Sequence, residues 1–297
     1  MSPRPVIVGL GEVLWDLYPD ATHFGGAPAN FASHAASLGA EAWMVSAVGA
    51  DDLGARALDA LCERGVHCVH LVQDPHHATG RVLVTLNAAG QASYEFAADT
   101  AWDHLAWSDG LAALAARSDA VYFGTLGQRS PASRETIRRF LQVTPRPALR
   151  VFDVNLRQRF YDRETIHTSL QLASALKLND EELPIVAELC AVRANTPREI
   201  LSELLTRYKL RLAALTRGPH GSLLISTDAE DECPAPPTTV VDTVGAGDAF
   251  TATLVTGFLR GLPLPEINRH ANAVASFVCS QNGATPALPE HLLAFGK

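Results

Sequence analysis

Cysteine is scarce in this sequence, and long apolar runs are absent from it. There are five cysteines in 297 residues, an odd number with no CxxC pair, so neither a disulfide framework nor a cysteine-based zinc site fits. No segment approaches the roughly 20 consecutive apolar residues of a membrane-spanning helix, and the N-terminus lacks the apolar core of a signal peptide. These absences predict a cytoplasmic protein with reduced thiols and no membrane partner.

The chain also lacks an excess of positive charge. Its formal net charge is −8, with 24 Lys and Arg against 32 Asp and Glu, which argues against nucleic acid as a partner. A bound phosphate group must then be held by backbone dipoles, a cation and a few basic side chains. The composition, 47% hydrophobic and 19% charged, is typical of a globular protein, and the length suits one large α/β domain or two smaller ones.

Short apolar runs alternate with helical patterns along most of the chain. The runs typical of buried strands are residues 6–10, 44–48, 121–124, 149–153 and 175–178. Apolar residues at helical spacing lie between them, at 51–64, 133–142 and 163–173. This alternation predicts a mostly parallel central sheet flanked by helices.

A different pattern interrupts this alternation near the N-terminus. Residues 12–18 alternate in polarity, and three successive β-like runs follow at 66–72, 80–86 and 92–96, the last two joined by a predicted hairpin turn at 87–90. We expect these runs to form a small sheet beside the main one.

The segment Asp242-Thr-Val-Gly-Ala-Gly-Asp248 stands directly before an amphipathic helical pattern. Its residues Gly245, Ala246 and Gly247 have little side-chain bulk, so consecutive backbone N–H groups can point at one spot where a helix begins, an arrangement that binds anions. Asp248 is either a first-turn cap or a general base that takes a hydroxyl proton beside developing phosphoryl charge. Asp242 either caps a turn or holds a cation.

A second glycine-rich motif, Phe24-Gly-Gly-Ala-Pro-Ala-Asn30, precedes a small-residue helix predicted at 32–38. Gly25 and Gly26 allow the backbone to approach a ligand closely, and Asn30 offers an amide donor and a carbonyl acceptor. The alternative is a tight turn with an asparagine cap.

The two motifs resemble the N-terminal and C-terminal signatures of the ribokinase-like (PfkB-type) carbohydrate kinases, in that family's order. The resemblance extends from Gly9 to Pro289, and within the family the sequence is most similar to fructokinases. It implies the ribokinase-like α/β fold as a single domain of residues 1–297, with a lid over the sugar formed by about 12–24 and 66–98. It also implies ATP and Mg²⁺ as cofactors, with Asp248 as the base and its glycine-rich neighbours as the oxyanion hole.

The resemblance implies further site residues in three groups. The sugar-binding residues are Asp16, Gly25, Gly26, Asn30, Phe96 and Arg157. The nucleotide-binding residues are Asn179, Thr216, Gly218, Gly221 and Asn272. Glu182 acts on Mg²⁺ through water, and a monovalent cation such as K⁺ is held by Asp242, Val244, Val278, Gln281, Gly283 and Ala287.

Structural alternatives stay open for several of these residues. Arg157, Arg159 and Asp162 could form a solvated ion-pair surface. The segment 179–182 could simply be a helix N-terminus, with Asn179 as its cap and Asp180 and Glu181 at the positive end. The small sheet could be an edge sheet that covers nothing, and its exposure also makes it a candidate surface for a homodimer. We expect residues 228–232 to form an acidic turn.

The predicted reaction is transfer of the γ-phosphoryl group of ATP to a primary hydroxyl of a small sugar, with fructose, giving fructose 6-phosphate, favoured. The alternatives within the class are 2-keto-3-deoxygluconate, ribose, tagatose phosphate and a nucleoside. A phosphorylated sugar is disfavoured because Arg81 is almost the only basic residue near the lid, whereas a nucleoside could stack on aromatic residues, the candidates being Trp15, Phe24, Tyr94 and Phe96.

Two other classes of function are weaker. A non-catalytic sugar sensor of the same fold would not need Asp248 in an intact glycine cradle. A dinucleotide-binding oxidoreductase is disfavoured because Gly9-Leu-Gly11 lacks both the third glycine and a helix that begins there.

Overall fold

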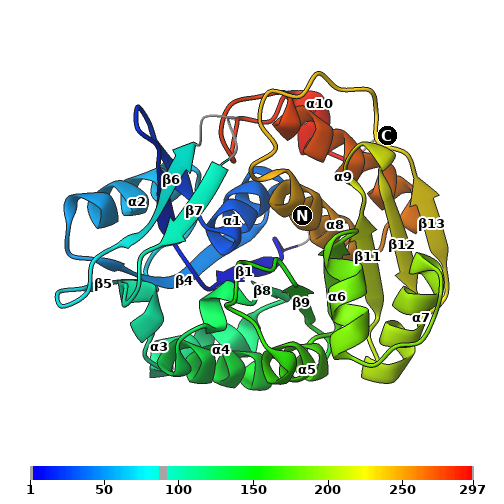
Figure 1. Ribbon diagram of the computed structural model, residues 1–297, viewed down its shortest axis with the longest axis horizontal. Helices are drawn as coiled ribbons and strands as arrows, with labels where there is room; N and C mark the ends of the chain where they lie inside the picture. The colour runs from blue at the N-terminus through cyan, green and yellow to red at the C-terminus, as the bar shows by residue number, and fades with distance from the viewer. Residues whose placement is uncertain (1–2, 87–91, 296–297) are drawn as a thin grey trace.

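The computed structural model of the protein describes residues 3–86 and 92–295. A nine-stranded sheet lies at its centre, in the order β13-β12-β11-β10-β9-β8-β1-β4-β5 (Figure 1). In chain order these strands are β1 (Val6–Leu10), β4 (Glu41–Gly49), β5 (Leu71–Asp74), β8 (Ala120–Phe123), β9 (Leu149–Asp153), β10 (Ala175–Asn179), β11 (Leu212–Thr216), β12 (Ser222–Ser226) and β13 (Glu230–Cys233). Pairing is parallel from β11 to β5 and antiparallel for β12 and β13, which confirms the mostly parallel sheet.

Helices cover both faces of this sheet, because nearly all of its strands are apolar on both sides. Residues of the helices on one face pack into one apolar cluster with the strands; these helices are α3 (Asp109–Arg117), α4 (Pro131–Val143), α5 (Arg163–Leu172), α6 (Glu182–Leu189) and α7 (Pro197–Tyr208). The other face is covered by α1 (Ala27–Ser37), α2 (Asp52–Glu63), α8 (Ala246–Leu259) and α9 (Leu264–Cys279), with α10 (Glu290–Leu293) against α9 (Figure 1). No helix in the described ranges is long and apolar enough to span a bilayer.

A separate four-stranded sheet lies beside α1 and α2 (Figure 1). Its order is β3-β2-β6-β7, made of β2 (Leu14–Leu17), β3 (Thr22–Gly25), β6 (Gly80–Leu86) and β7 (Ala92–Phe96). β2 and β6 pair in parallel, and the other two pairs are antiparallel. The predicted hairpin turn at 87–90 lies outside the described residues.

Two local predictions are wrong. The run at 66–72 does not join the small sheet: β5 pairs in parallel with β4, and Leu71 is buried in the cluster that contains Met44 and Val48. The segment 228–232 is not only a turn, because β13 pairs along β12 and closes one end of the large sheet. In both cases a distant partner strand decides the structure.

The carboxyl ends of the parallel strands place polar residues at one edge of the large sheet. Asp153 ends β9, and Asn179 and Thr216 are paired at the ends of β10 and β11. Ligands bind at this edge in open α/β sheets, so the fold directs attention to the loops that follow these strands.

Candidate functional site

Helix α8 begins at the glycine-rich segment identified in the sequence. Gly245 is its N-cap with φ of 79°, and a Cβ at this position would lie 2.3 Å from the carbonyl oxygen of Ala284. Only glycine suits both the left-handed backbone and the close approach. Ala246 and Gly247 are the first residues of the helix. The N–H of Ala246 makes only a long contact of 3.4 Å to the carbonyl of Thr243, so the N–H groups of this first turn and the helix dipole favour an anion here.

Asp248 stands in the first turn of α8 and is buried. Its Oδ2 accepts a hydrogen bond of 2.9 Å from Nδ2 of Asn30, a residue 218 positions away, and its Oδ1 lies 3.5 Å from the hydroxyl of Tyr122. The two motifs of the sequence therefore meet. Burial and the neighbouring carboxylate of Asp153 raise the pKa of Asp248 to about 7, although the hydrogen bond from Asn30 acts in the opposite direction.

Two buried oxygens beside Asp248 have no donor among the described residues. They are Oδ1 of Asn30 and Oε2 of Glu12. Unpaired buried acceptors are costly, so the site is suited to a ligand that brings hydroxyl donors. Burial raises the pKa of Glu12 to about 7, opposed in part by Arg157.

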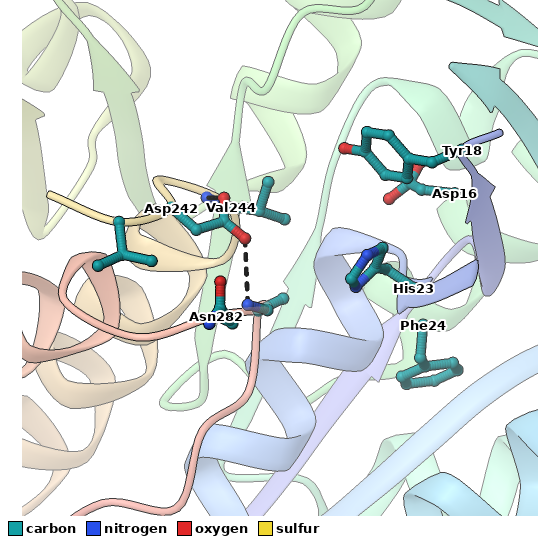
Figure 2. Close-up of a pocket in the computed structure, with 10 residues that line it drawn as sticks. Asp16, Tyr18, His23, Phe24, Asp242, Val244 and Asn282 are labelled. Atoms are coloured by element: carbon teal, nitrogen blue, oxygen red, sulfur yellow. Dashed lines mark hydrogen bonds between the residues drawn. The ribbon is translucent and has the colours of Figure 1, made fainter. Parts of the chain in front are cut away.

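A cavity of about 250 Å³ lies between the small sheet and two loops, one of which includes Ala284, the residue that packs against Gly245 at the start of α8. Figure 2 shows Asp16, Tyr18 and His23 on the side of the small sheet, facing Asp242 and its neighbours across the cavity. The remaining lining residues are Phe24, Val241, Val244, Asn282, Gly283 and Ala284. Burial raises the pKa of Asp16 to about 6, with Arg157 and His23 acting against it.

Of the predicted sugar-binding residues, Asp16 lines this cavity, and Gly25 and Gly26 shape the backbone next to it. Gly26, with φ of 107°, brings the start of α1 against the carbonyl of Glu12, where a Cβ would lie 2.6 Å away. A Cβ at Gly25 would lie 3.0 Å from Oδ2 of Asp16, so this glycine leaves room for that carboxylate. Arg157 is exposed, and its charge lowers the pKa of the nearby carboxyls.

Phe96 lies elsewhere on the small sheet. It packs edge to face against Phe160, with ring centroids 5.7 Å apart, and does not line the cavity. Among the other aromatic candidates, Trp15 is buried with its indole N–H donated to the carbonyl of Leu53, and Tyr94 is half exposed. Of these four residues, only Phe24 faces the cavity.

The predicted cation-binding residues lie on two adjacent loops. Asp242 joins them, because its Oδ2 accepts the N–H of Gly283 at 3.1 Å (Figure 2). Its Oδ1 accepts the N–H of Val244 at 3.0 Å. The carbonyl of Val278 accepts the N–H of Gln281 at the end of α9. Ala287 lines a second hollow, of about 450 Å³, beside His34. The structure thus brings Asp242, Val244 and Gly283 together, whereas Ala287 lies against a different cavity.

The predicted nucleotide-binding residues follow β10 and β11. The side chains and backbones of Asn179 and Glu182 bond reciprocally, at 2.8 and 2.9 Å, and Glu182 also accepts the N–H of Leu156 at 2.9 Å. Gly218 and Gly221 both have positive φ, around a short 3₁₀ turn after Thr216. These residues therefore lie next to one another at the carboxyl ends of β10 and β11.

Asn272 is buried within α9. Its side-chain amide donates to the hydroxyl of Ser222 at 2.7 Å and to the carbonyl of Asn268 at 2.9 Å. These bonds link α9 to β12, so in the structure its side chain has a structural role.

Sequence reasoning missed Lys177. Its ammonium, on β10, lies 3.1 Å from Oδ1 of Asp153, and both side chains are almost fully buried. Burial alone would lower the pKa of Lys177, but the carboxylates of Asp153, Glu182 and Asp248 outweigh it and raise that pKa. A Cβ at Gly247 would lie 3.1 Å from Nζ of Lys177, which puts a positive charge directly beneath the anion cradle.

Comparisons with known proteins place the chain in a family. Residues 20–291 match the pfkB family carbohydrate kinase model. The sequence is 31% identical over 308 residues to an uncharacterized sugar kinase of Pyrococcus horikoshii, covering 97% of this chain and 94% of that protein. It is 28% identical over 308 residues to the fructokinase of Escherichia coli, covering 94% and 95%. The chain therefore belongs to the pfkB family of carbohydrate kinases.

The solved structures agree with this assignment. The crystal structure of the Pyrococcus horikoshii protein in complex with ATP matches 94% of both chains with a TM-score of 0.80 and 29% identity. The fructokinase of Xylella fastidiosa with bound ATP matches with a TM-score of 0.84 over 96% of this chain and 95% of that chain, at 23% identity. The ribokinase-like fold expected from the sequence is confirmed.

We expect Lys177→Met to destabilise the protein by roughly 3–5 kcal/mol, because it leaves the Asp153 carboxylate buried without its partner. The measurement is the free energy of unfolding in urea. Adding Asp153→Asn should recover part of this loss, so that the double variant is less destabilised than the sum of the single ones.

The matched control is Arg117→Met, which breaks the exposed ion pair with Glu41 and should cost no more than about 1 kcal/mol. If Lys177→Met costs as little as the control, Asp153 is not held as a carboxylate by that lysine.

Proposed function

We propose that the protein is an ATP-dependent sugar kinase that phosphorylates a primary hydroxyl of a small sugar, fructose in particular, to give fructose 6-phosphate. The observation that carries the proposal is the hydrogen bond from Asn30 to Asp248. It joins a helix start suited to anions with a motif whose Asn30 offers a hydroxyl group an acceptor, Oδ1, that has no donor among the described residues. Membership of the pfkB family and similarity to fructokinases support the same reaction.

Asp248 is the proposed general base. Its pKa of about 7 suits a group that accepts a proton near neutral pH, since efficiency is greatest when the pKa lies near the working pH. The bound ATP supplies the transferred γ-phosphoryl group. The N–H groups of Ala246, Gly247 and Asp248 stabilise the negative charge that develops on it, and Lys177 adds a positive charge behind them.

Acceptors for sugar hydroxyl groups lie on both sides of the cavity. Asp16 on the small sheet and Asp242 on the opposite loop line it. Asn30 on α1 and Glu12, which precedes β2, offer further oxygens beside Asp248, and the charge of Arg157 acts on Glu12 and Asp16. A cavity lined by Asp16 and Asp242 suits a neutral polyol better than an anion. This argues against 2-keto-3-deoxygluconate, whose carboxylate would meet these carboxylates.

The nucleotide is proposed to lie along Asn179, Thr216, Gly218 and Gly221, with its adenine toward the α9 residue Asn272. Each carboxylate oxygen of Glu182 accepts one backbone N–H and keeps a second lone pair. The residue thus fits a role through water molecules of hydrated Mg²⁺, which gives up its water reluctantly. The loops joined by Asp242 are proposed to hold a monovalent cation such as K⁺.

The small sheet is proposed as a lid, because its strands β2 and β3 form one wall of the cavity. The division into one domain of residues 1–297 with a lid, a homodimer paired through that lid and a cytoplasmic location remain predictions from the sequence.

A nucleoside kinase is the second candidate function. Phe24 and Tyr18 line the cavity and could stack on a base. Trp15 and Phe96, however, are used in internal packing, so there is little aromatic surface for a base, and the sugar remains favoured. These aromatic residues favour neither ribose nor fructose as the substrate.

In a coupled assay of ADP release, we expect fructose to give the highest kcat/KM among fructose, ribose, 2-keto-3-deoxygluconate and adenosine. The same assay with Asp248→Asn protein excludes a contaminating kinase. Preference for another substrate would overturn the assignment of fructose, while the assignment as a kinase would stand. Thermal stabilisation by sugar without any turnover would instead identify a sensor.

Asp248→Asn should reduce kcat by about 10²–10⁴-fold, the usual contribution of a general base, while sugar and ATP still bind in calorimetry. The control is Asp109→Asn, which changes an exposed aspartate in the first turn of α3. If Asp248 merely caps its helix, the two variants will have similar activity.

The pH dependence follows from the raised pKa of Asp248. Since the ionised carboxylate is the active form, kcat/KM should fall about tenfold per pH unit below a midpoint near pH 7 and be level above it. Asn30→Ala removes a bond that lowers this pKa, so its midpoint should move to higher pH. Glu12 has a similar pKa, and its carboxylate and that of Asp248 repel each other. Glu12→Gln should therefore keep the acid limb and move its midpoint slightly to lower pH, whereas loss of the limb would identify Glu12 as the base. A midpoint near 4 in the unchanged protein would remove Asp248 from the role of base.

A further inference from the structure

Two of the segments that connect the small sheet to the rest of the protein lie side by side. Residues 75–79 lead from β5 into β6, and residues 97–100 lead from β7 into the 3₁₀ helix η1 (Ala101–His104). The N–H of Ala101 donates to the carbonyl of Ala78 at 2.8 Å. Any group that binds to both connecting segments therefore acts at the base of the small sheet.

A cluster of potential metal ligands occupies this place. The rings of His77 and His104 are stacked, with centroids 3.6 Å apart and planes at 12°. One ligand atom from each of His77, His104 and Asp99 lies within 4.8 Å of the other two. Two imidazoles and one carboxylate are a donor set that suits Zn²⁺ and similar divalent transition metals.

A fourth residue orients the first histidine. Nδ1 of His77 lies 2.7 Å from Oδ2 of Asp74, and Oδ1 of Asp74 accepts the N–H groups of His76 and His77 at 2.7 and 3.2 Å. With its proton on Nδ1, His77 presents the lone pair of Nε2. A carboxylate behind a histidine is the usual support of a metal-binding imidazole, because it fixes the tautomer and increases basicity.

Both histidines are carried by anchored backbone. Thr79, two residues after His77, bonds to Asp51 through its N–H at 2.9 Å and its hydroxyl at 2.6 Å. His104 ends η1, which begins with a capping box between Thr100 and Asp103. The ligands therefore come from positions that the fold already holds.

The contacts also show how an ion would enter. Nε2 of His104 now lies 2.7 Å from Oδ1 of Asp99, whose side chain is 75% exposed. A metal would replace the proton shared by these atoms. In a neutral His104 the ring then carries its proton on Nδ1, and a protonated ring releases one proton to water. The stacked rings must open so that both nitrogens point to one ion, and the partial exposure of both side chains leaves space for this.

We propose that His77, His104 and Asp99 bind one divalent transition-metal ion of the zinc type, that Asp74 orients His77, and that the ion ties the two connecting segments together. None of these residues lines the cavity between the small sheet and the loops. The proposal stands whether or not the chain phosphorylates a sugar.

The test is calorimetric titration of metal-free protein with ZnCl₂ near neutral pH, without nucleotide or magnesium. We expect saturation at one ion per chain and a rise in the thermal unfolding temperature, and Co²⁺ should give the visible absorption bands of a low-coordinate nitrogen and oxygen site. Binding should be lost in His104→Ala and weakened roughly 10–100-fold in Asp74→Asn.

The matched control is His76→Ala, which removes an exposed histidine next to His77 and should bind Zn²⁺ like the unchanged protein. His104→Gln is a second variant, and both variants are compared by thermal unfolding without metal to show that they fold. The absence of saturable binding, or equal binding by the His104 and His76 variants, would overturn the proposal and leave a stacked surface pair of histidines.

Discussion

A carboxylate kept out of water at the start of α8 is the constraint on which the site depends. Burial disfavours the charge of Asp248, and a second buried carboxylate, Asp153, adds to the effect. The surrounding elements compensate: α1 supplies the amide of Asn30, and β10 supplies the ammonium of Lys177. The packing of α1 against α8 on one face of the large sheet is thus also what makes a titratable group with a pKa near neutrality.

The distribution of charge divides the site into two parts. Carboxylates line the cavity beside the small sheet. The other part is the start of α8, which has the ammonium of Lys177 behind it. Hydroxyl groups and phosphate groups therefore find different environments a short distance apart. The chain has a net charge of −8. Backbone N–H groups therefore replace many of the basic side chains that would otherwise bind an anion.

The sequence predicted the class of fold and the two motifs well, because both have local signals. The strands at 6–10 and 149–153 have the expected bounds, and glycine marks the backbone positions where side chains do not fit. Lys177 was missed, although a charge between Leu176 and Leu178 in an apolar strand was a signal. The positions of 66–72 and 228–232 could not be found locally, since pairing with β4 and β12 decides them. The lining of the cavity joins distant segments and has no pattern of its own.

Strand β13 has a consequence for association between chains. It ends the large sheet and carries the consecutive acidic residues Glu230, Asp231 and Glu232, with Arg198 and Arg217 paired to its glutamates. An added strand from a second molecule would have to displace the water around these charges. Charged side chains on an outermost strand are a common protection against uncontrolled β-pairing, so this side of the molecule is a poor template for aggregation.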